Sequence, residues 1–213
     1  MSRSAFFEYR AWPSDGLPHI ETLHHLFGLG VAEIRTDTYI FSPHRPRWMI
    51  MLRGGENLEI LEKDGEDGPL SVWKQVAQSG FPLRRSVVKL LLQAFPDADL
   101  SHRIYVPGDV ISWLDRDTLM FTVSTRSVKF ERGSYYAEFS QVEADGRRAE
   151  TFSISSRRAE FVMDEVLPLL PLPRLSNLDY ASWLLDRPWN AEPVESGRFD
   201  AARSFSLGTA QVA

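Results

Sequence analysis

The chain has 213 residues, of which 43% are hydrophobic and 25% charged, a composition typical of a globular protein with its own hydrophobic core. It contains no cysteine, which excludes disulfide-held scaffolds, thiolate metal sites and cysteine nucleophiles. The formal net charge of −5 argues against an extended nucleic-acid-binding surface. A local basic site inside an acidic protein remains compatible with that charge.

Nothing in the sequence points to export or to a membrane. The first residues lack the long apolar stretch of a signal peptide, and no apolar run reaches the length of a membrane span. The absence of cysteine fits a reducing compartment. We therefore expect a cytoplasmic protein without a membrane partner.

The first part of the chain predicts strands and one helix. Aromatic and polar residues alternate over 6–12, which predicts a strand, and the spacing of Ile20, Leu23 and Leu26 predicts a helix over 18–28. Three further stretches alternate in the same way and are predicted as strands: 32–41, 47–53 and 58–63.

The second part predicts helices on both sides of a group of strands. Helices are predicted over 71–78 and 83–95, and the second is amphipathic and ends at Pro96. Five strands are predicted next: 104–106, 109–113, 118–130, 134–142 and 148–154. Helical segments over 160–169 and 177–185 follow them.

This order of elements predicts one domain. Strands precede and follow a helical insertion, and no low-complexity linker divides them, so we expect a single α+β domain over residues 1–186. Beyond Arg187 the composition shifts to Pro, Gly, Ser and Ala, which predicts a loose C-terminal tail over 187–213.

Several predicted strands are charged on one face and apolar on the other. Glu8 and Arg10 share one face of the first strand, and Arg35, Asp37 and Tyr39 share one face of the next. In the later strands, we assign the following charged residues to the same face: Arg53, Glu59, Lys63, Arg126, Glu138, Arg148 and Glu150. Two arrangements satisfy the pattern. Either the charges face water on a half-solvated sheet, or they line a barrel whose apolar outside is covered by helices.

A resemblance favours the barrel. Short motifs between residues 6 and 185 follow one another in an order similar to that of the CYTH superfamily, the triphosphate tunnel metalloenzymes. They are Glu8-Tyr-Arg10, Arg35-Thr-Asp-Thr-Tyr39, Leu52-Arg53, Ile60-Leu-Glu-Lys63, Thr125-Arg126, the Glu138 strand, Ala149-Glu150-Thr-Phe-Ser and Asp179-Tyr180-Ala-Ser-Trp-Leu184. The resemblance implies an antiparallel CYTH-like β-barrel or tunnel with helices packed on the outside.

The resemblance also implies a site. Basic residues of the family hold a triphosphate and its glutamates hold a divalent metal, a division that suits both chemistries. The implied phosphate-binding residues are Arg10, Arg35, Arg53, Lys63 and Arg126. The implied metal-binding residues are Glu8, Glu138 and Glu150, with Mg²⁺ or Mn²⁺ as cofactor.

The chain departs from the family's paired motifs. The family opens with Glu-x-Glu-x-Lys, whereas the corresponding positions here are Phe6, Glu8 and Arg10. The closing Glu-x-Glu of the family becomes Arg148 and Glu150. The missing partners argue against a two-metal arrangement and favour binding over hydrolysis.

Three functions remain open at this point. The first is a metal-dependent phosphohydrolase acting on a triphosphate-containing substrate. The second is a non-catalytic module that binds a small molecule or polyanion in the cationic interior of the barrel. The third is a barrel that contacts other proteins, with the proline-rich end of the chain as the adhesive part. The expected partner of the first two is a phosphorylated small molecule or a polyphosphate.

Overall fold

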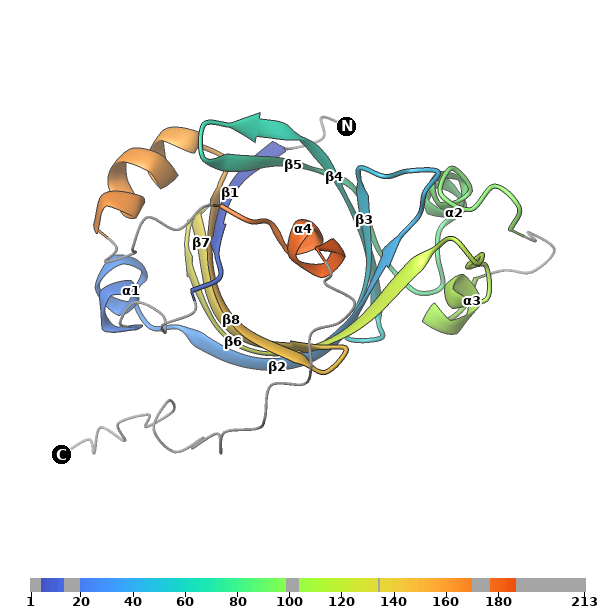
Figure 1. Ribbon diagram of the computed structural model, residues 1–213, viewed down its shortest axis with the longest axis horizontal. Helices are drawn as coiled ribbons and strands as arrows, with labels where there is room; N and C mark the ends of the chain where they lie inside the picture. The colour runs from blue at the N-terminus through green and yellow to red at the C-terminus, as the bar shows by residue number, and fades with distance from the viewer. Residues whose placement is uncertain (1–4, 14–19, 99–103, 134, 170–176, 187–213) are drawn as a thin grey trace.

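The computed structural model describes residues 5–13, 20–98, 104–133, 135–169 and 177–186. Within these residues, eight antiparallel strands close into a barrel in the order β1-β5-β4-β3-β2-β6-β7-β8 (Figure 1). The strands are β1 (Ala5–Ala11), β2 (Val31–Phe41), β3 (Trp48–Arg53), β4 (Asn57–Asp67), β5 (Leu70–Gly80), β6 (Leu119–Arg132), β7 (Tyr135–Ala144) and β8 (Arg147–Ser156). The predicted α+β antiparallel barrel is confirmed.

Strand β1 closes the barrel. Phe7 lies opposite Val72 of β5 on one side and opposite Ser156 of β8 on the other. The first strand of the chain therefore joins two strands that come much later in the sequence. Closure leaves no sheet edge with unpaired backbone groups.

Helices pack on the outside of the barrel in two groups (Figure 1). The helical elements are α1 (Ile20–Phe27), α2 (Arg85–Leu91), α3 (Pro107–Ile111), the π-helical η1 (Phe161–Val166), the 3₁₀ turn η2 (Leu167–Leu169) and α4 (Tyr180–Leu185). Helices α2 and α3 cover the outer face of β3 and its neighbours, whereas α1 and η1 lie on the opposite side. Helix α4 differs from all of these, because it lies within the ring of strands.

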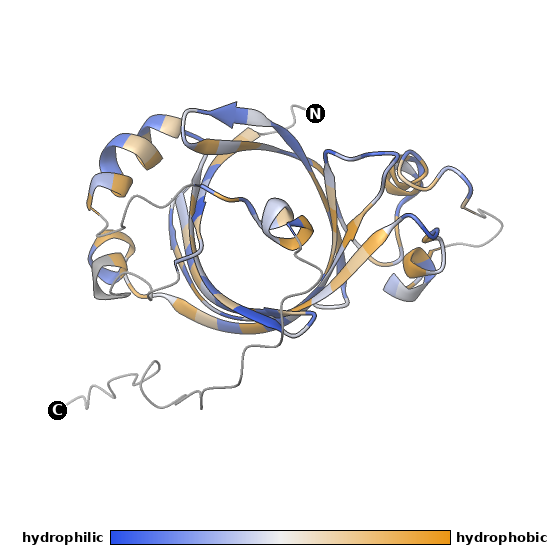
Figure 2. Cartoon of the chain, viewed as in Figure 1, coloured by the Kyte–Doolittle hydropathy of each residue, from blue (hydrophilic) through white to orange (hydrophobic). Residues whose placement is uncertain are grey.

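The outer cores explain the alternation in the sequence. Hydrophobic and hydrophilic residues alternate along the strands (Figure 2). Ile50 of β3 and Ile60 of β4 point outward and pack against Val87 and Leu91 of α2. Each such fully buried aliphatic side chain contributes about 1.5–3 kcal/mol relative to exposure. Burial of the apolar outer faces under helices leaves the charged faces inside.

The predicted helix over 71–78 is wrong, because this segment is strand β5. Ile60 pairs with Ala77 and Leu61 with Gln75, so Val76 is an extra residue in a β-bulge. A bulge shifts the alternation of side chains by one position. Trp73 packs in the core inside the barrel, whereas the neighbours Val76 and Ala77 both pack against the outer core, so the simple alternation that predicts a strand is broken.

The predicted strands over 104–106 and 109–113 are also wrong. Helix α3 occupies this region, and its start is fixed by Asp109. The Asp109 carboxylate accepts hydrogen bonds from the backbone N–H groups of Tyr105 and Val106, at 2.7 and 3.0 Å. Pro107 occupies the first helical turn, where its missing N–H is not needed. These are helix-start signals within an apolar, β-branched sequence.

Two remaining expectations concern the ends of the chain and the membrane. The predicted loose tail, residues 187–213, lies outside the described residues. In the part of the chain that the structure describes, no helix combines the length and the apolar character that a membrane crossing requires.

Candidate binding chamber inside the barrel

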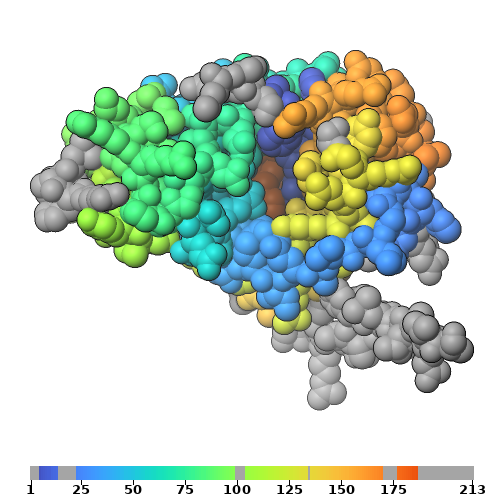
Figure 3. Space-filling model, turned by 180° about the vertical axis from the view of Figure 1, so that it is seen from behind, coloured from blue at the N-terminus to red at the C-terminus, as the bar shows by residue number. Residues whose placement is uncertain are grey.

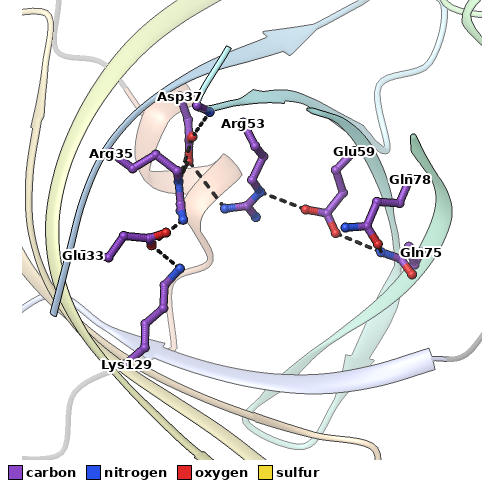
Figure 4. A network of polar contacts seen from close by, with 9 residues as sticks. Glu33, Arg35, Asp37, Arg53, Glu59, Gln75, Gln78 and Lys129 are labelled. Atoms are coloured by element: carbon purple, nitrogen blue, oxygen red, sulfur yellow. Dashed lines mark hydrogen bonds and ion pairs between the residues drawn. The ribbon is translucent and has the colours of Figure 1, made fainter. Parts of the chain in front are cut away.

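The barrel lumen is lined by the charged faces of the strands. Tyr9 of β1 packs in the outer core, so its neighbours Glu8 and Arg10 point inward. By the same alternation, Leu52 of β3 packs outside and Arg53 points into the lumen (Figure 4). Glu8, Arg10 and Arg53 therefore lie inside the barrel, as the alternation of the sequence predicts.

Helix α4 closes one end of the lumen from within (Figure 1). The backbone N–H of Leu178 donates to the carbonyl of Arg10 at 3.0 Å, and the indole N–H of Trp12 donates to the carbonyl of Leu178 at 2.7 Å. These bonds lead the chain along β1 into the barrel. Tyr180 then stacks on Tyr39 of β2, with ring centroids 4.9 Å apart.

A cavity of about 170 Å³ remains in the lumen, with Tyr180 among its walls, and is called the chamber here. Seen from behind, the barrel opens in a hollow through which parts of β1 and α4 are visible (Figure 3). The polar residues that line the chamber are Glu8, Arg10, Arg35, Tyr39, Arg53, Thr125, Tyr136, Glu138, Ser140, Ser153, Ser155 and Tyr180. The serines of β7 and β8 fill little volume and so leave room for a ligand.

A chain of ion pairs holds the arginines of β2 and β3 (Figure 4). Asp37 is 1% exposed and lies between two guanidinium groups, 2.7 Å from Arg35 Nε and 3.5 Å from Arg53 Nη1. It also accepts a hydrogen bond from the backbone N–H of Gly54 at 3.0 Å. Arg53 Nε donates to Glu59 at 2.8 Å. These bonds fix both arginines against the wall of the lumen.

Arg10 forms a separate charged group on the β1 side of the chamber. Its Nε lies 2.8 Å from the Glu8 carboxylate, and its Nη1 lies 3.4 Å from the hydroxyl of Thr151. Its guanidinium also lies over the ring of Tyr180, 5.0 Å from the ring centroid. Glu138 of β7 lines the same chamber without an ion pair or hydrogen bond to any described residue.

The electrostatic surroundings keep the arginines charged. Burial disfavours the charged form of Arg53, but Tyr39, Glu59 and Asp37 outweigh burial and raise its pKa. Burial likewise opposes the charge of Arg10, whose pKa is nevertheless raised by Glu8 and then Glu138. Burial raises the pKa of Tyr39 to about 12, so its hydroxyl is neutral and able to donate at neutral pH.

Lys63 lines a neighbouring pocket, next to Asp179, and not the chamber. Its ammonium is 2.8 Å from the carboxylate of Asp179, which precedes α4, and 3.3 Å from that of Glu66. Lys63 therefore binds the segment that leads into α4, and it is not among the residues that line the chamber. Its predicted role in phosphate binding has no support in this position.

The interior positions expected for Arg126, Arg148 and Glu150 are wrong. Thr125 is buried against the chamber, so Arg126 points to the outer surface, where it is exposed. Thr151 contacts Arg10 in the lumen, so Glu150 lies on the outer face and accepts a hydrogen bond from Gln141 at 3.2 Å. Successive residues of a strand face opposite sides.

The predicted Mg²⁺ or Mn²⁺ site does not fit the residues present. Glu150 lies outside the barrel, and Glu8 is already bound to Arg10. Among the described residues, no three His, Cys, Asp or Glu side chains converge in a way that could hold a metal ion. Magnesium and manganese require several oxygen ligands around one point.

Sequence reasoning left several lumen residues out of its site. Glu33 of β2 is 2.6 Å from Arg35 Nη1 and also contacts Lys129 of β6 (Figure 4). Gln75 donates to Glu59 at 3.0 Å. Glu33 lies two residues before Arg35, so strict alternation along β2 could have found it. The sequence does not identify Gln75, because the β-bulge interrupts the alternation of its strand and the segment over 71–78 is predicted as a helix.

Comparisons with known proteins agree with the fold. No protein-family model matches the chain, and no curated protein matches it. A solved structure of a conserved hypothetical protein from Pyrococcus furiosus is similar, with a TM-score of 0.50 at 14% identity over 83% of this chain and 98% of the other. At that identity the likeness concerns the fold alone. The architecture expected from the sequence, a closed antiparallel barrel with helices outside, is the one this chain adopts.

Two further solved structures match with lower scores. HpAC1 from Hippeastrum, described as a candidate adenylyl cyclase with a dominant triphosphatase activity, has a TM-score of 0.43 at 8% identity, over 75% of this chain and 82% of the other. A candidate adenylate cyclase from Bacillus halodurans, bh2851, has a TM-score of 0.42 at 11% identity, over 76% and 86%.

Proposed function

We propose that this barrel is a binding module that holds a small phosphorylated molecule in the chamber. The observation that carries the proposal is the placement of Arg10, Arg35 and Arg53 around a single cavity. A guanidinium offers five N–H donors in a planar fork, which suits phosphate oxygens. Arg53 uses Nε and Nη1 for Glu59 and Asp37, and its Nη2 bonds to no described residue.

The size of the chamber limits what enters it. Its volume of about 170 Å³ is below the roughly 300–1,000 Å³ of pockets that enclose drug-sized ligands. A phosphate, a pyrophosphate or a short phosphorylated molecule matches this space better than a whole nucleotide. The tyrosine hydroxyls and the serines of the walls supply further donors.

The proposal is limited to binding. The three predicted metal ligands do not converge, and within the described ranges no other set of His, Cys, Asp or Glu side chains could hold the cation that the hydrolase hypothesis required. The arginines are ion-paired to carboxylates within the lumen, so an incoming phosphate must share them. We therefore expect weaker affinity than unpaired arginines would give.

Calorimetric titration with orthophosphate, pyrophosphate and tripolyphosphate tests the proposal. Arg53→Ala should weaken binding about 10- to 100-fold, since a charged hydrogen bond contributes roughly 1.5–3 kcal/mol. Arg126→Ala is the matched control, because it removes an arginine from the outer face of the same barrel. Thermal unfolding of each variant without ligand verifies that the barrel is intact.

Two results would contradict the proposal. Equal losses in Arg53→Ala and Arg126→Ala would show that phosphate binds to the surface and not in the chamber. Release of phosphate from tripolyphosphate in the presence of Mg²⁺ or Mn²⁺, absent with EDTA, would show hydrolysis and overturn the limitation to binding.

A further inference from the structure

Charge is unevenly distributed across the chamber. On the β1 and β7 side, one guanidinium, that of Arg10, faces two carboxylates, those of Glu8 and Glu138. Arg10 is bonded to Glu8 at 2.8 Å. Glu138 lies near enough for its charge to raise the pKa of Arg10, but it makes no ion pair within the described part of the chain. This side therefore carries an uncompensated negative charge.

On the opposite side of the chamber, positive and negative charges are equal in number. Arg35 and Arg53 are matched by Asp37 and Glu59, and Glu33 at the rim is matched by Lys129 (Figure 4). The charge of Arg53 acts to lower the pKa of Arg35, so the two guanidinium groups are close enough to repel each other. Asp37 already lies between them, so a phosphate would bind through the N–H donors that Asp37, Glu33 and Glu59 leave unused.

Lys129 does not compensate Glu138 in this structure. The two residues lie directly opposite each other in the β6–β7 register, where oppositely charged side chains usually pair. The Lys129 ammonium instead contacts Glu33 of β2. Glu138, which is half-buried, is thus left facing the chamber without a charged partner among the described residues.

The Tyr180 hydroxyl is a second polar group without a full partner. It is buried, and Thr125 lies close to it, but no well-formed hydrogen bond joins the two. Tyr180 lines the same chamber as Glu138 and Arg53. Buried polar groups of folded proteins are nearly always bonded. The buried Tyr180 hydroxyl and the half-buried Glu138 carboxylate thus face one cavity without a hydrogen bond from a described residue, and a ligand with both donor and acceptor groups would satisfy them.

We propose that the ligand is a short phosphorylated amine, with its phosphate on Arg35 and Arg53 and its ammonium on Glu138. The inference rests on the proposed function and specifies the ligand class of the same chamber. A phosphate alone adds negative charge to a chamber that already carries an excess on the Glu138 side. An ammonium on the same molecule removes that excess, and the volume of about 170 Å³ keeps the two groups only a few bonds apart.

The test compares two ligands of nearly equal shape. O-phosphoethanolamine and propyl phosphate differ in that an ammonium replaces a methyl group. In calorimetric titrations with EDTA present, wild-type protein should bind phosphoethanolamine at least about tenfold more tightly. Glu138→Gln should abolish this preference without weakening propyl phosphate. Glu150→Gln, which alters a glutamate on the outer face, should keep it.

The outcomes separate this inference from the proposed function. If wild-type protein binds both ligands equally and Arg53→Ala weakens both, the chamber binds phosphate but the amine has no site, and the inference fails alone. If neither ligand nor orthophosphate binds, both proposals fail. The ligand comparison on wild-type protein decides the matter even if Glu138→Gln does not fold.

Discussion

Asp179 links the charged lumen to the segment that closes it. Its side chain is 2% exposed, accepts a hydrogen bond from the backbone N–H of Ser182 at 2.8 Å and lies 2.8 Å from the Lys63 ammonium. Burial alone would raise the pKa of Asp179, but Lys63 and Ser182 outweigh it and hold the pKa below its ordinary value. The carboxylate thus caps α4 and anchors the helix to β4 at once.

The stability that this carboxylate contributes should depend on pH in one direction. A depressed pKa gives stability that is fully present above the unfolded-state pKa of about 3.9 and is lost as pH falls through the folded-state pKa. Asp179→Asn should therefore lower the free energy of unfolding by about 2 kcal/mol at pH 7, with the gap closing below about pH 4. Urea unfolding of both proteins across pH 3–8 measures it.

An exposed aspartate serves as control for that measurement. Asp117 lies on the surface, and its side chain makes no hydrogen bond or ion pair with the described residues. Asp117→Asn should show the same pH profile as the wild type. A gap between wild type and Asp179→Asn that persists unchanged at pH 3 would mean that the Asp179 side chain stabilises by packing and not by charge.

The alternation of apolar and polar residues along the strands predicted part of the site, but it failed in strands that are polar on both faces. Glu8, Arg10 and Arg53 belong to strands whose other face is apolar, and Ile34 and Ile40 mark the other face of the strand that carries Arg35, so their orientation follows from the sequence. Around Arg126 the residues Ser124, Thr125 and Ser127 are all polar, and nothing in the sequence distinguishes the two faces. A slip by one residue then exchanges lumen and surface.

At the scale of secondary structure, the sequence predicted the helix at 177–185 but not its place inside the barrel. That place depends on bonds to the far end of the chain: the side chain of Asn177 accepts from the backbone N–H of Arg10 at 2.8 Å and donates to Ser71 at 2.9 Å. Trp183 stacks on Trp12 with ring centroids 4.2 Å apart. Such long-range contacts leave no local pattern for sequence reasoning to detect.

The junction between α1 and β2 depends on a close approach at Gly30. A Cβ at this position would come within 2.5 Å of Val128 Cγ1 and 2.7 Å of a ring carbon of Phe130, and Phe130 is fully buried. Gly30→Ala should therefore lower the free energy of unfolding by about 1–3 kcal/mol, the usual cost of overpacking a core. Chemical denaturation measures the loss.

Gly108 in α3 provides the matched substitution. A Cβ there meets no atom within 4 Å, and helical residues favour alanine over glycine by about 0.5–1 kcal/mol. Gly108→Ala should leave stability unchanged or raise it slightly. Similar destabilisation by both substitutions would show that the effect is a general loss of glycine flexibility, unrelated to contact with Val128.

At the scale of the whole molecule, the first strand of the described chain contacts its last helical segment. Strand β1 pairs with both β5 and β8, and its Arg10 and Trp12 bind the segment that leads into α4. The inner core contains Tyr39, Met51 and Phe121 from the strands and Leu184 from α4. The barrel wall and the helix within it should therefore unfold together.

Two truncated chains test whether the barrel and α4 unfold together and whether the predicted domain boundary is correct. A chain ending at Asp186 keeps α4, and the composition beyond it predicts a loose tail, so its melting temperature should stay within about 2 °C of the full chain. A chain ending at residue 176 loses Tyr180, Trp183 and Leu184 from the lumen. At about 1.5–3 kcal/mol for each of these three side chains, the loss is about 4.5–9 kcal/mol or roughly 10–35 °C. Unchanged melting of the shorter chain would show that α4 only rests in a barrel that is stable alone, and a large loss at 186 would extend the domain into the tail.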